Sequence, residues 1–302
     1  MRMTVLILAA ALPAFAQSAR GPIIDVHVHS RLPEQFAGGA PPNPATGLPG
    51  KAGTADELLR QTIAAMKKYG IVKGIVSSGF KPLESIAPWL DAAPGLFIGS
   101  CGIATNGMEN GPAVETVRSE IAAHRIAVLG EIGAQWAGIN PADERLEPYF
   151  ALAEELDIPV GIHTGLGEPG APLHGNPNFR AALGNPMLLE PVLIRHPKLR
   201  LYLMHAGWPF LEETKAILHV YPQVYVDVAV INWAIPRPEF HEYLRALIRA
   251  GFEQRIMFGS DQMFWPEAIG MAVEGVDSAS FLTRSQKRDI FYNNAARFFR
   301  LQ

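Results

Sequence analysis

The chain has 302 residues, of which 48% are hydrophobic, so it can bury the core of one large domain or of two smaller ones. Its formal net charge is -3, and only 18% of its residues are charged. This balance excludes the basic stripe with which proteins bind nucleic acid or anionic lipid. Because Cys101 is the sole cysteine, no intramolecular disulfide can form, and we expect a small buried hydrophobe at this position.

Residues 1–16 are typical of a secretory signal peptide. Arg2 precedes the apolar run VLILAAALPAFA, which closes on Ala14-Phe15-Ala16, a small-x-small cleavage signature. The alternative is an uncleaved apolar N-terminus that packs on the domain. The run is too short to span a bilayer comfortably, and no later stretch has about twenty unbroken apolar residues, so we expect no stable membrane insertion. The mature protein, residues 17–302, would then be exported, either periplasmic or secreted.

Short apolar runs alternate with amphipathic segments along the rest of the chain. Strands are expected at residues 23–29, 72–79, 96–104, 126–133, 159–165, 199–207, 224–232 and 255–263. Between them we expect helices at residues 54–70, opened by a capping box of Thr54 and Glu57, and at 82–93, 112–125, 143–157, 185–197, 210–222 and 238–251.

This alternation indicates a parallel sheet covered by helices, and eight such units in a chain of this length indicate a single-domain (β/α)₈ barrel. A doubly wound open sheet is the alternative, but no Gly-x-Gly-x-x-Gly follows the first strand, as its dinucleotide-binding form would require. Long loops rich in Gly and Pro follow the strands at 23–29 and 159–165. In a barrel both would lie at the carboxyl ends of the strands, where barrel enzymes carry their active sites.

Two histidines one residue apart close the first strand. Side chains alternate along a strand, so His27 and His29 would face one side while Val26 and Val28 face the other. Two neutral imidazoles side by side suit one metal ion. The alternative is that one histidine caps the strand and the other is solvated.

Other ionisable residues end later strands, and in a barrel they would meet the two histidines at one mouth: Glu131, His163, His205 and Asp261. Each alone could be structural, as a core histidine, a surface ion pair or a turn cap. Together, four imidazoles and two carboxylates buried without a cation would leave polar groups unpaired at several kcal/mol each. This ligand set, which lacks thiolate, suits Zn²⁺, and Mn²⁺, Fe²⁺ or Ni²⁺ are admissible.

The remaining histidines and the rim aromatics carry weaker signals. We expect the histidines in or beside helical segments to be solvated or structural, namely His124, His196, His219 and His241. His174, in the loop after residues 159–165, could line the pocket. The aromatic side chains beyond the strand ends could wall the rim or favour an apolar or aromatic substrate group; they are Trp136, Trp208, Trp233, Phe264 and Trp265.

The ordered set of Asp25-Val26-His27-Val28-His29, His163, His205 and Asp261 resembles the amidohydrolase superfamily of metal-dependent barrel hydrolases, and more narrowly its amidohydrolase-related branch. The resemblance covers nearly the whole mature chain. It implies that His27, His29 and Asp261 bind one metal of a binuclear centre, and that His163 and His205 bind the second. Some members bridge the metals with a carboxylated lysine. No lysine stands at that strand end here, and Glu131 resembles the bridging glutamate of the phosphotriesterase-like and related branches.

Two such cations would activate a shared water and polarise a carbonyl or phosphoryl oxygen of a small-molecule substrate, with Asp261 as ligand and general base. The resemblance therefore implies a metal-dependent hydrolase of an ester, amide or lactone. The main alternative is a lyase, because decarboxylases of this branch share the strand pattern but use one metal and leave His205 for the substrate. The third alternative is a non-catalytic binding protein that keeps the barrel fold. The complete set of metal ligands argues against it. A homo-oligomer is compatible with the sequence.

The N-terminal pattern also predicts how the chain is processed. A precursor that begins at Met1 should lose residues 1–16 on export and leave a mature chain that begins at about Gln17. Intact-mass measurement on protein from the exporting cell tests this expectation. A soluble cytoplasmic pool that retains Met1 would contradict it.

Overall fold

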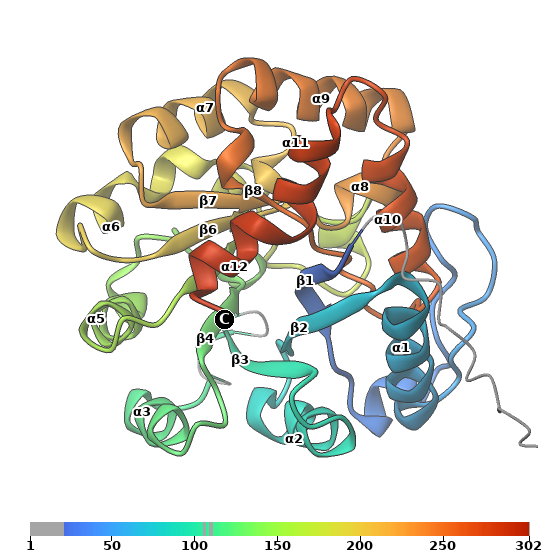
Figure 1. Cartoon of the computed structure of the whole chain (residues 1–302). Helices are drawn as coiled ribbons and strands as arrows, with labels where there is room; N and C mark the ends of the chain where they lie inside the picture. Colours follow the sequence, from blue (N-terminus) through green and yellow to red (C-terminus); the bar gives the residue numbers. More distant parts are fainter. Residues whose placement is uncertain (1–20, 105–106, 109–110, 302) are drawn as a thin grey trace, which may run out of the picture.

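The computed structural model describes residues 21–104, 107–108 and 111–301. Within this part, eight parallel strands form one sheet in the order β1 to β8, so that each strand pairs with the next one along the chain (Figure 1). The predicted signal peptide, residues 1–16, lies outside the described residues, and export stays a prediction.

The strands agree with the sequence pattern, although the later ones are shorter than expected. They are β1 (Ile23–His29), β2 (Ile71–Ser77), β3 (Phe97–Ile103), β4 (Val128–Ile132), β5 (Val160–His163), β6 (Leu201–Met204), β7 (Val224–Asp227) and β8 (Ile256–Met257). The expected strand at 224–232 ends at Asp227, since the chain beyond it turns into a short helix.

Backbone bonds between β1 and the segment after β8 close the sheet into a barrel. The Val26 N–H donates to the Phe258 carbonyl at 3.0 Å, and the Asp261 N–H donates to the His27 carbonyl at 2.8 Å. The predicted single-domain (β/α)₈ barrel is thereby confirmed. Closure of the barrel brings Asp261, which follows the last strand, beside the first strand.

Helices surround the barrel, as Figure 1 shows. They are α1 (Ala55–Tyr69), α2 (Pro82–Ala92), α3 (Val114–Ala122), α4 (Ala134–Ala137), α5 (Glu147–Glu155), α6 (Glu190–Arg195), α7 (Leu211–Val220), α8 (Ile231–Ala234), α9 (Arg237–Arg249), α10 (Ala268–Asp277), α11 (Arg284–Arg288) and α12 (Asn294–Phe299). Shorter turns include the 3₁₀ segments η1 (Pro33–Phe36), η3 (Glu144–Leu146), η6 (Pro186–Leu189) and η7 (His205–Gly207), and a π-helical turn, η9 (Asp289–Asn293).

Two helix predictions differ in detail from the structure. The Thr54 side chain accepts from the Glu57 N–H as expected, but the Glu57 carboxylate accepts from Gly53 rather than from Thr54, so the capping box is only half formed. The helices expected at 143–157 and 185–197 each begin as a 3₁₀ turn, and the α-helix starts only where Pro148 or Pro191 supplies a residue without an N–H.

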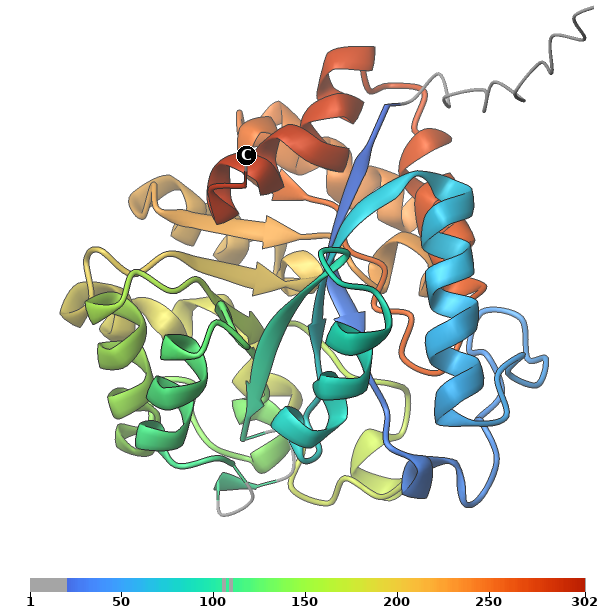
Figure 2. The ribbon, with the colours of Figure 1, turned by 60° about the horizontal axis from the view of Figure 1, so that its bottom comes forward.

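The helices that follow β8 had no counterpart among the expected elements. They are α10, α11 and α12, and the last one closes one end of the barrel. Phe298 of α12 packs edge-on against Tyr202 of β6, with ring centroids 5.7 Å apart. In Figure 2, α12 lies at the end of the barrel away from the point of the β1 arrow, and the chain after β1 lies at the opposite end. Helix α12 therefore does not cover the mouth formed by the carboxyl ends of the strands.

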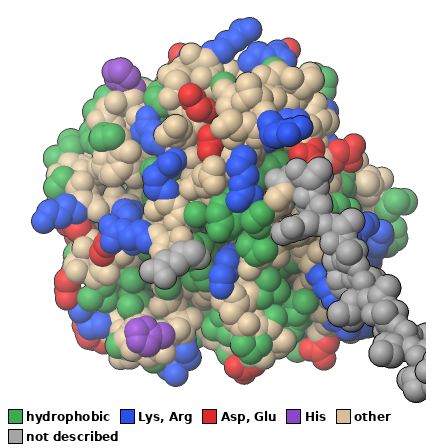
Figure 3. All heavy atoms as spheres, in the orientation of Figure 1, with side chains coloured by type: hydrophobic (Ala, Val, Ile, Leu, Met, Phe, Trp, Pro, Cys, Tyr) green, Lys and Arg blue, Asp and Glu red, His purple; other side chains and the backbone are tan. Residues whose placement is uncertain are grey.

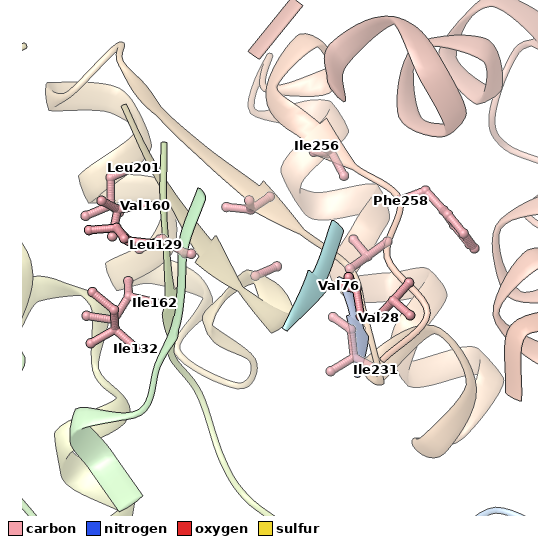
Figure 4. Packing of buried hydrophobic residues seen from close by; sticks show 14 of the residues in the cluster. Val28, Val76, Leu129, Ile132, Val160, Ile162, Leu201, Ile231, Ile256 and Phe258 are labelled. Carbon is pink, nitrogen blue, oxygen red and sulfur yellow. The ribbon is translucent and has the colours of Figure 1, made fainter. Parts of the chain in front are cut away.

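Two apolar layers hold the barrel together. The outer layer lies between strands and helices, and Figure 4 shows 14 of its members, among them the labelled Leu129, Val160 and Leu201. The inner layer joins residues of strands on opposite sides of the barrel to α12: Ile24, Val26, Ile75, Val128, Tyr202, Met204, Met257, Ala295 and Phe298. Cys101 is fully buried, as expected for a small hydrophobe.

Register shifts turn the polar residues of β1 and β4 into the mouth. Val26 belongs to the inner layer, although the histidine after it also faces inward, because the pairing of β1 with β2 shifts register between Asp25 and Val28. The expectation that Val26 faces away from the histidines is wrong for this reason, whereas Val28 packs in the outer layer. A shift between Leu129 and Ile132 of β4 likewise flanks Glu131.

The surface carries charges of both signs. Figure 3 shows one face, on which Lys and Arg side chains are interspersed with Asp, Glu and hydrophobic side chains. Among the described residues, no helix combines the length and the apolar character that a bilayer crossing requires.

Gly161 of β5 offers a test of the inner packing. An added β-carbon there would overlap the ring of Tyr202, which is fully buried and cannot move aside. We expect Gly161→Ala to lower the free energy of unfolding by about 1–3 kcal/mol, the usual range for overpacking. Urea unfolding measures the change. The matched control is Gly38→Ala, where an added β-carbon meets nothing within 4 Å; equal losses in both variants would contradict this account.

Candidate metal centre

The two histidines of β1 bring ring nitrogens together at the barrel mouth. His27 and His29 are both buried, and their Nε2 atoms lie 3.1 Å apart. Two ring nitrogens at this separation are directed toward the same small volume. The two imidazoles therefore face one site, and their role as metal ligands stays a prediction.

Asp227, the last residue of β7, orients His27. Its Oδ2 lies 3.1 Å from His27 Nδ1, while its Oδ1 accepts from the backbone N–H groups of His205 at 2.8 Å and Ala229 at 3.0 Å. A carboxylate at Nδ1 favours the tautomer that leaves Nε2 unprotonated and directed at the centre. Asp227 was not among the residues predicted from the sequence, although its place at the end of a strand is the same signal that identified Asp261.

His29 lies against Asp261, which follows β8. His29 Nε2 is 3.1 Å from Asp261 Oδ1. The side-chain amide of Gln262 accepts from the His29 N–H at 2.9 Å and donates to the His29 carbonyl at 2.7 Å. The segment after β8 therefore holds the main chain of His29 in place through Gln262 while it presents Asp261 to the ring.

Glu131 lies between two pairs of histidines. Its Oε2 is 3.4 Å from His29 Nε2 and 3.8 Å from His27 Nε2. Its Oε1 is 3.8 Å from His163 Nε2 and 3.9 Å from His205 Nε2. One carboxylate oxygen thus faces the β1 pair and the other faces the pair from β5 and η7.

The second pair of histidines is oriented through its Nδ1 atoms. His163 Nδ1 lies 2.8 Å from Gln135 Oε1, and the amide nitrogen of Gln135 donates to the Gly165 carbonyl at 2.8 Å. His205 Nδ1 lies 3.1 Å from the Ala229 carbonyl. Both Nε2 atoms therefore face Glu131. Gln135 and Gln262 are buried amides that were not predicted either, since nothing in the local sequence marks an amide as a partner of a histidine.

The charges of these groups suit a cation. Burial would raise the pKa of Glu131, but the nearby imidazoles of His205 and His27 hold it well below its ordinary value. Burial likewise opposes ionisation of Asp261, yet the charge of His27 lowers its pKa. Burial lowers the pKa of His163 to about 3, so this imidazole is neutral at physiological pH. Ionised carboxylates and a neutral imidazole are the forms that bind metals.

The residues present fit a divalent cation. Two groups of residues could each hold a metal ion, because the ligand atoms within each group all lie within 4.8 Å of one another. One group is His27, His29 and Asp261, and the other is His27, Glu131 and His205. All six predicted site residues are buried and meet at one mouth: His27, His29, Glu131, His163, His205 and Asp261. Imidazole and carboxylate donors in this number are a typical set for Zn²⁺ and related metals.

The other histidines lie away from this centre or are held elsewhere. His196 is buried between Glu147, at 2.8 Å, and Glu154, at 3.1 Å, in agreement with a structural role. His241 lies 3.0 Å from the Gly275 carbonyl. His174 is exposed in the loop after β5 and is not among the residues that meet at the centre.

The aromatic side chains at the rim fall into two groups. One borders the candidate metal centre, and the others lie in the wall of the barrel or on its exposed side. Trp136 packs edge-on against His163, with ring centroids 5.4 Å apart, so it borders the centre. Trp233 packs against Trp265 at 5.9 Å, and Trp233 Nε1 donates to the Ser260 carbonyl, which places this pair in the wall. Trp208 donates to Glu239 on the exposed side.

These features define the class of protein: a (β/α)₈ barrel with clustered histidines and carboxylates at its mouth. A family model described as Amidohydrolase matches residues 24–301. The chain belongs to the amidohydrolase family, as its motifs indicated.

Individual proteins resemble the chain more distantly. The Protein fluG of Emericella nidulans is 25% identical over 122 residues, which are 40% of this chain and only 13% of that protein. A probable 2-pyrone-4,6-dicarboxylic acid hydrolase from Acinetobacter baumannii superposes with a TM-score of 0.65 at 14% identity, covering 92% of this chain and 99% of the other. A 2,6-dihydroxybenzoate decarboxylase from Rhizobium does so with a TM-score of 0.63 at 16% identity, covering 93% and 99%. These structures share the fold.

Asp227 provides a test of how the centre is oriented. Asp227→Asn keeps the shape of the side chain but weakens the acceptor at His27 Nδ1, and loss of such a partner commonly lowers metal affinity by about 10–100-fold. We expect this loss for Zn²⁺ in competition with a chromogenic chelator. Asp91→Asn, on the exposed side of α2, is the control and should bind Zn²⁺ as the wild type does. Unchanged affinity in Asp227→Asn would contradict the orienting role.

Proposed function

We propose that the protein is a hydrolase that uses two divalent cations, most simply Zn²⁺, with Mn²⁺, Fe²⁺ or Ni²⁺ as alternatives. His27, His29 and Asp261 would hold one cation, His163 and His205 the other, and Glu131 both. The observation that carries this proposal is the placement of the two Glu131 oxygens, each of which faces a different pair of histidines. A carboxylate shared in this way offsets the repulsion between two cations. When bound, such a pair supplies an activated water and polarises the bond to be cleaved.

The residues of the chain have separate tasks in this proposal. Asp261 accepts the proton, because it is the carboxylate in the segment after β8 whose backbone N–H is anchored to the His27 carbonyl at 2.8 Å. Asp227 and Gln135 keep the rings of His27 and His163 in their orientations. Trp136, edge-on to His163, offers an apolar surface to the substrate beside the reacting bond. The substrate is then a small molecule with an ester, amide or lactone bond next to an apolar or aromatic group.

A decarboxylase is the second candidate. The set of His27, His29 and Asp261 is compact enough to hold one cation without Glu131. A single-metal lyase would add His163 and leave His205 to orient or protonate the substrate, which is compatible with the raised pKa of His205: burial lowers it, and the Glu131 carboxylate raises it beyond that effect. The shared fold of a decarboxylase structure is consistent with this candidate.

Metal stoichiometry in Glu131→Ala separates the two candidates. We expect close to two metals per chain in the wild type, and loss of at least one metal with most hydrolytic activity in the variant, because the second metal would be left with two neutral imidazoles. Elemental analysis under identical loading gives the counts. A panel of lactones, N-acyl amino acids, phosphoesters and aryl carboxylates, assayed for hydrolysis and for release of carbon dioxide, gives the reaction.

The matched control is Glu155→Ala, which removes a carboxylate from an exposed ion pair with Arg118. It should keep the metal content and the activity of the wild type, since exposed pairs contribute little to stability. One metal per chain in the wild type and in Glu131→Ala, with carbon dioxide as the product, would replace the hydrolase by the decarboxylase.

A further inference from the structure

The backbone around Asp261 has a conformation that non-glycine residues rarely adopt. Asp261 has a φ of 48°, in the left-handed region, and Met263 follows with a φ of 44°. Such a conformation costs free energy and persists only where the surrounding contacts impose it. The contacts that hold this segment therefore decide where the Asp261 carboxylate lies.

Two side chains of α8 hold the carbonyl groups directly before Asp261. Asn232 Nδ2 donates to the Gly259 carbonyl at 2.9 Å, and Trp233 Nε1 donates to the Ser260 carbonyl at 2.7 Å. Asn232 is 1% exposed and Trp233 is 4% exposed. Because both donors are buried, a carbonyl that loses its donor finds no solvent to replace it.

Strand β1 holds the N–H groups of the same two peptide units. The Ser260 N–H donates to Asp25 Oδ1, and the Asp261 N–H donates to the His27 carbonyl, both at 2.8 Å. Each unit is thus bonded at its N–H to β1 and at its carbonyl to α8. A peptide unit bonded at both ends cannot turn without breaking a hydrogen bond. The carboxylate of Asp261 is held in this way beside His29, 3.1 Å away.

The turn that leads into α8 also orients two histidines of the centre. Asp227 Oδ2 lies 3.1 Å from His27 Nδ1. The Ala229 carbonyl lies 3.1 Å from His205 Nδ1. Val230, the next residue, has φ 57° and ψ −48°, which a β-branched side chain rarely allows, so the shape of this turn is imposed by its surroundings. Helix α8 therefore begins at a fixed place relative to both rings.

We infer that Asn232 and Trp233 are positioning residues for the Asp261 carboxylate. By fixing the backbone before it, they set the geometry around the cation that Asp261 would share with His27 and His29. The inference rests on the proposed metal-dependent function and goes beyond it, because it assigns control of the cation to two side chains that do not bind it. Loss of either donor should let Asp261 move relative to the two rings.

Substitution with Co²⁺ tests this inference without turnover, because the visible absorption of Co²⁺ depends on the number and arrangement of its ligands. Trp233→Phe loses the Nε1 donor but keeps an aromatic ring, and we expect it to shift the absorption bands of the fully loaded protein. Its affinity for Co²⁺, measured against a competing chelator, should fall by about tenfold, the low end for outer partners of metal ligands, since Trp233 acts through the backbone. Asn232→Leu removes the other donor at similar volume and should change both readouts.

The matched control is Trp265→Phe. Trp265 is buried and packs on Trp233, and its Nε1 also donates to a main-chain carbonyl at 2.7 Å. That carbonyl belongs to Pro41, in the loop after β1, and not to the segment before Asp261. The control should keep the absorption bands and the Co²⁺ affinity of the wild type, whatever its melting temperature.

Thermal melts accompany each variant, because a side chain that only stabilises the wall would lower the melting temperature and leave the bands in place. The inference is overturned if Trp233→Phe keeps the bands and the affinity of the wild type, or if Trp265→Phe changes them as much. Should Trp233→Phe not fold, Asn232→Leu decides by the same two readouts. Wild-type protein that binds no Co²⁺ would overturn the proposed metal-dependent function together with the inference, so the two failures are distinguishable.

Discussion

The contact between β1 and the segment after β8 is the constraint on which the site depends. Two backbone bonds close the barrel there, and the buried Asp25 carboxylate adds a third link, because its Oδ1 accepts from the Ser260 N–H at 2.8 Å and from the His27 N–H at 3.1 Å. Burial raises the pKa of Asp25 to about 7, and the bonds from Ser260 oppose that effect. This junction holds Asp261 against His29, although the two residues stand near opposite ends of the chain.

The barrel separates an apolar end from a polar one. Tyr202, Met204 and Phe298 fill the end closed by α12, so that the histidines and carboxylates gather only at the other end. The register shifts in β1 and β4 mark the change from one zone to the other, because they turn polar residues inward where strict alternation would point them at the helices. The same strands therefore stabilise the barrel at the end closed by α12 and carry the histidines and carboxylates at the other end.

Around the histidines lies a layer of residues that fix ring orientation. Asp227, Gln135 and the Ala229 carbonyl each occupy the Nδ1 side of one ring, which leaves Nε2 for the centre. Rings held in this way lose little freedom when a cation binds, so affinity is not reduced by ordering them. Arg31 differs from this layer: its guanidinium stacks on Phe264, and its Nε has no hydrogen-bond acceptor among the described residues.

Much of the fold and of the centre could be read from the sequence, because periodicity and strand-end positions are local properties. The alternation of apolar strands with amphipathic helices determined the barrel, and the carboxyl ends of parallel strands necessarily converge, so residues such as His163 and Asp261 could be grouped before any coordinates. Tertiary structure alone decided which side chains face inward past a register shift, as Val26 and Glu131 illustrate. It also decided which neutral or distant groups pair with them, such as Gln135 with His163. A hydrogen bond between residues far apart in the chain depends on distances that no local pattern encodes.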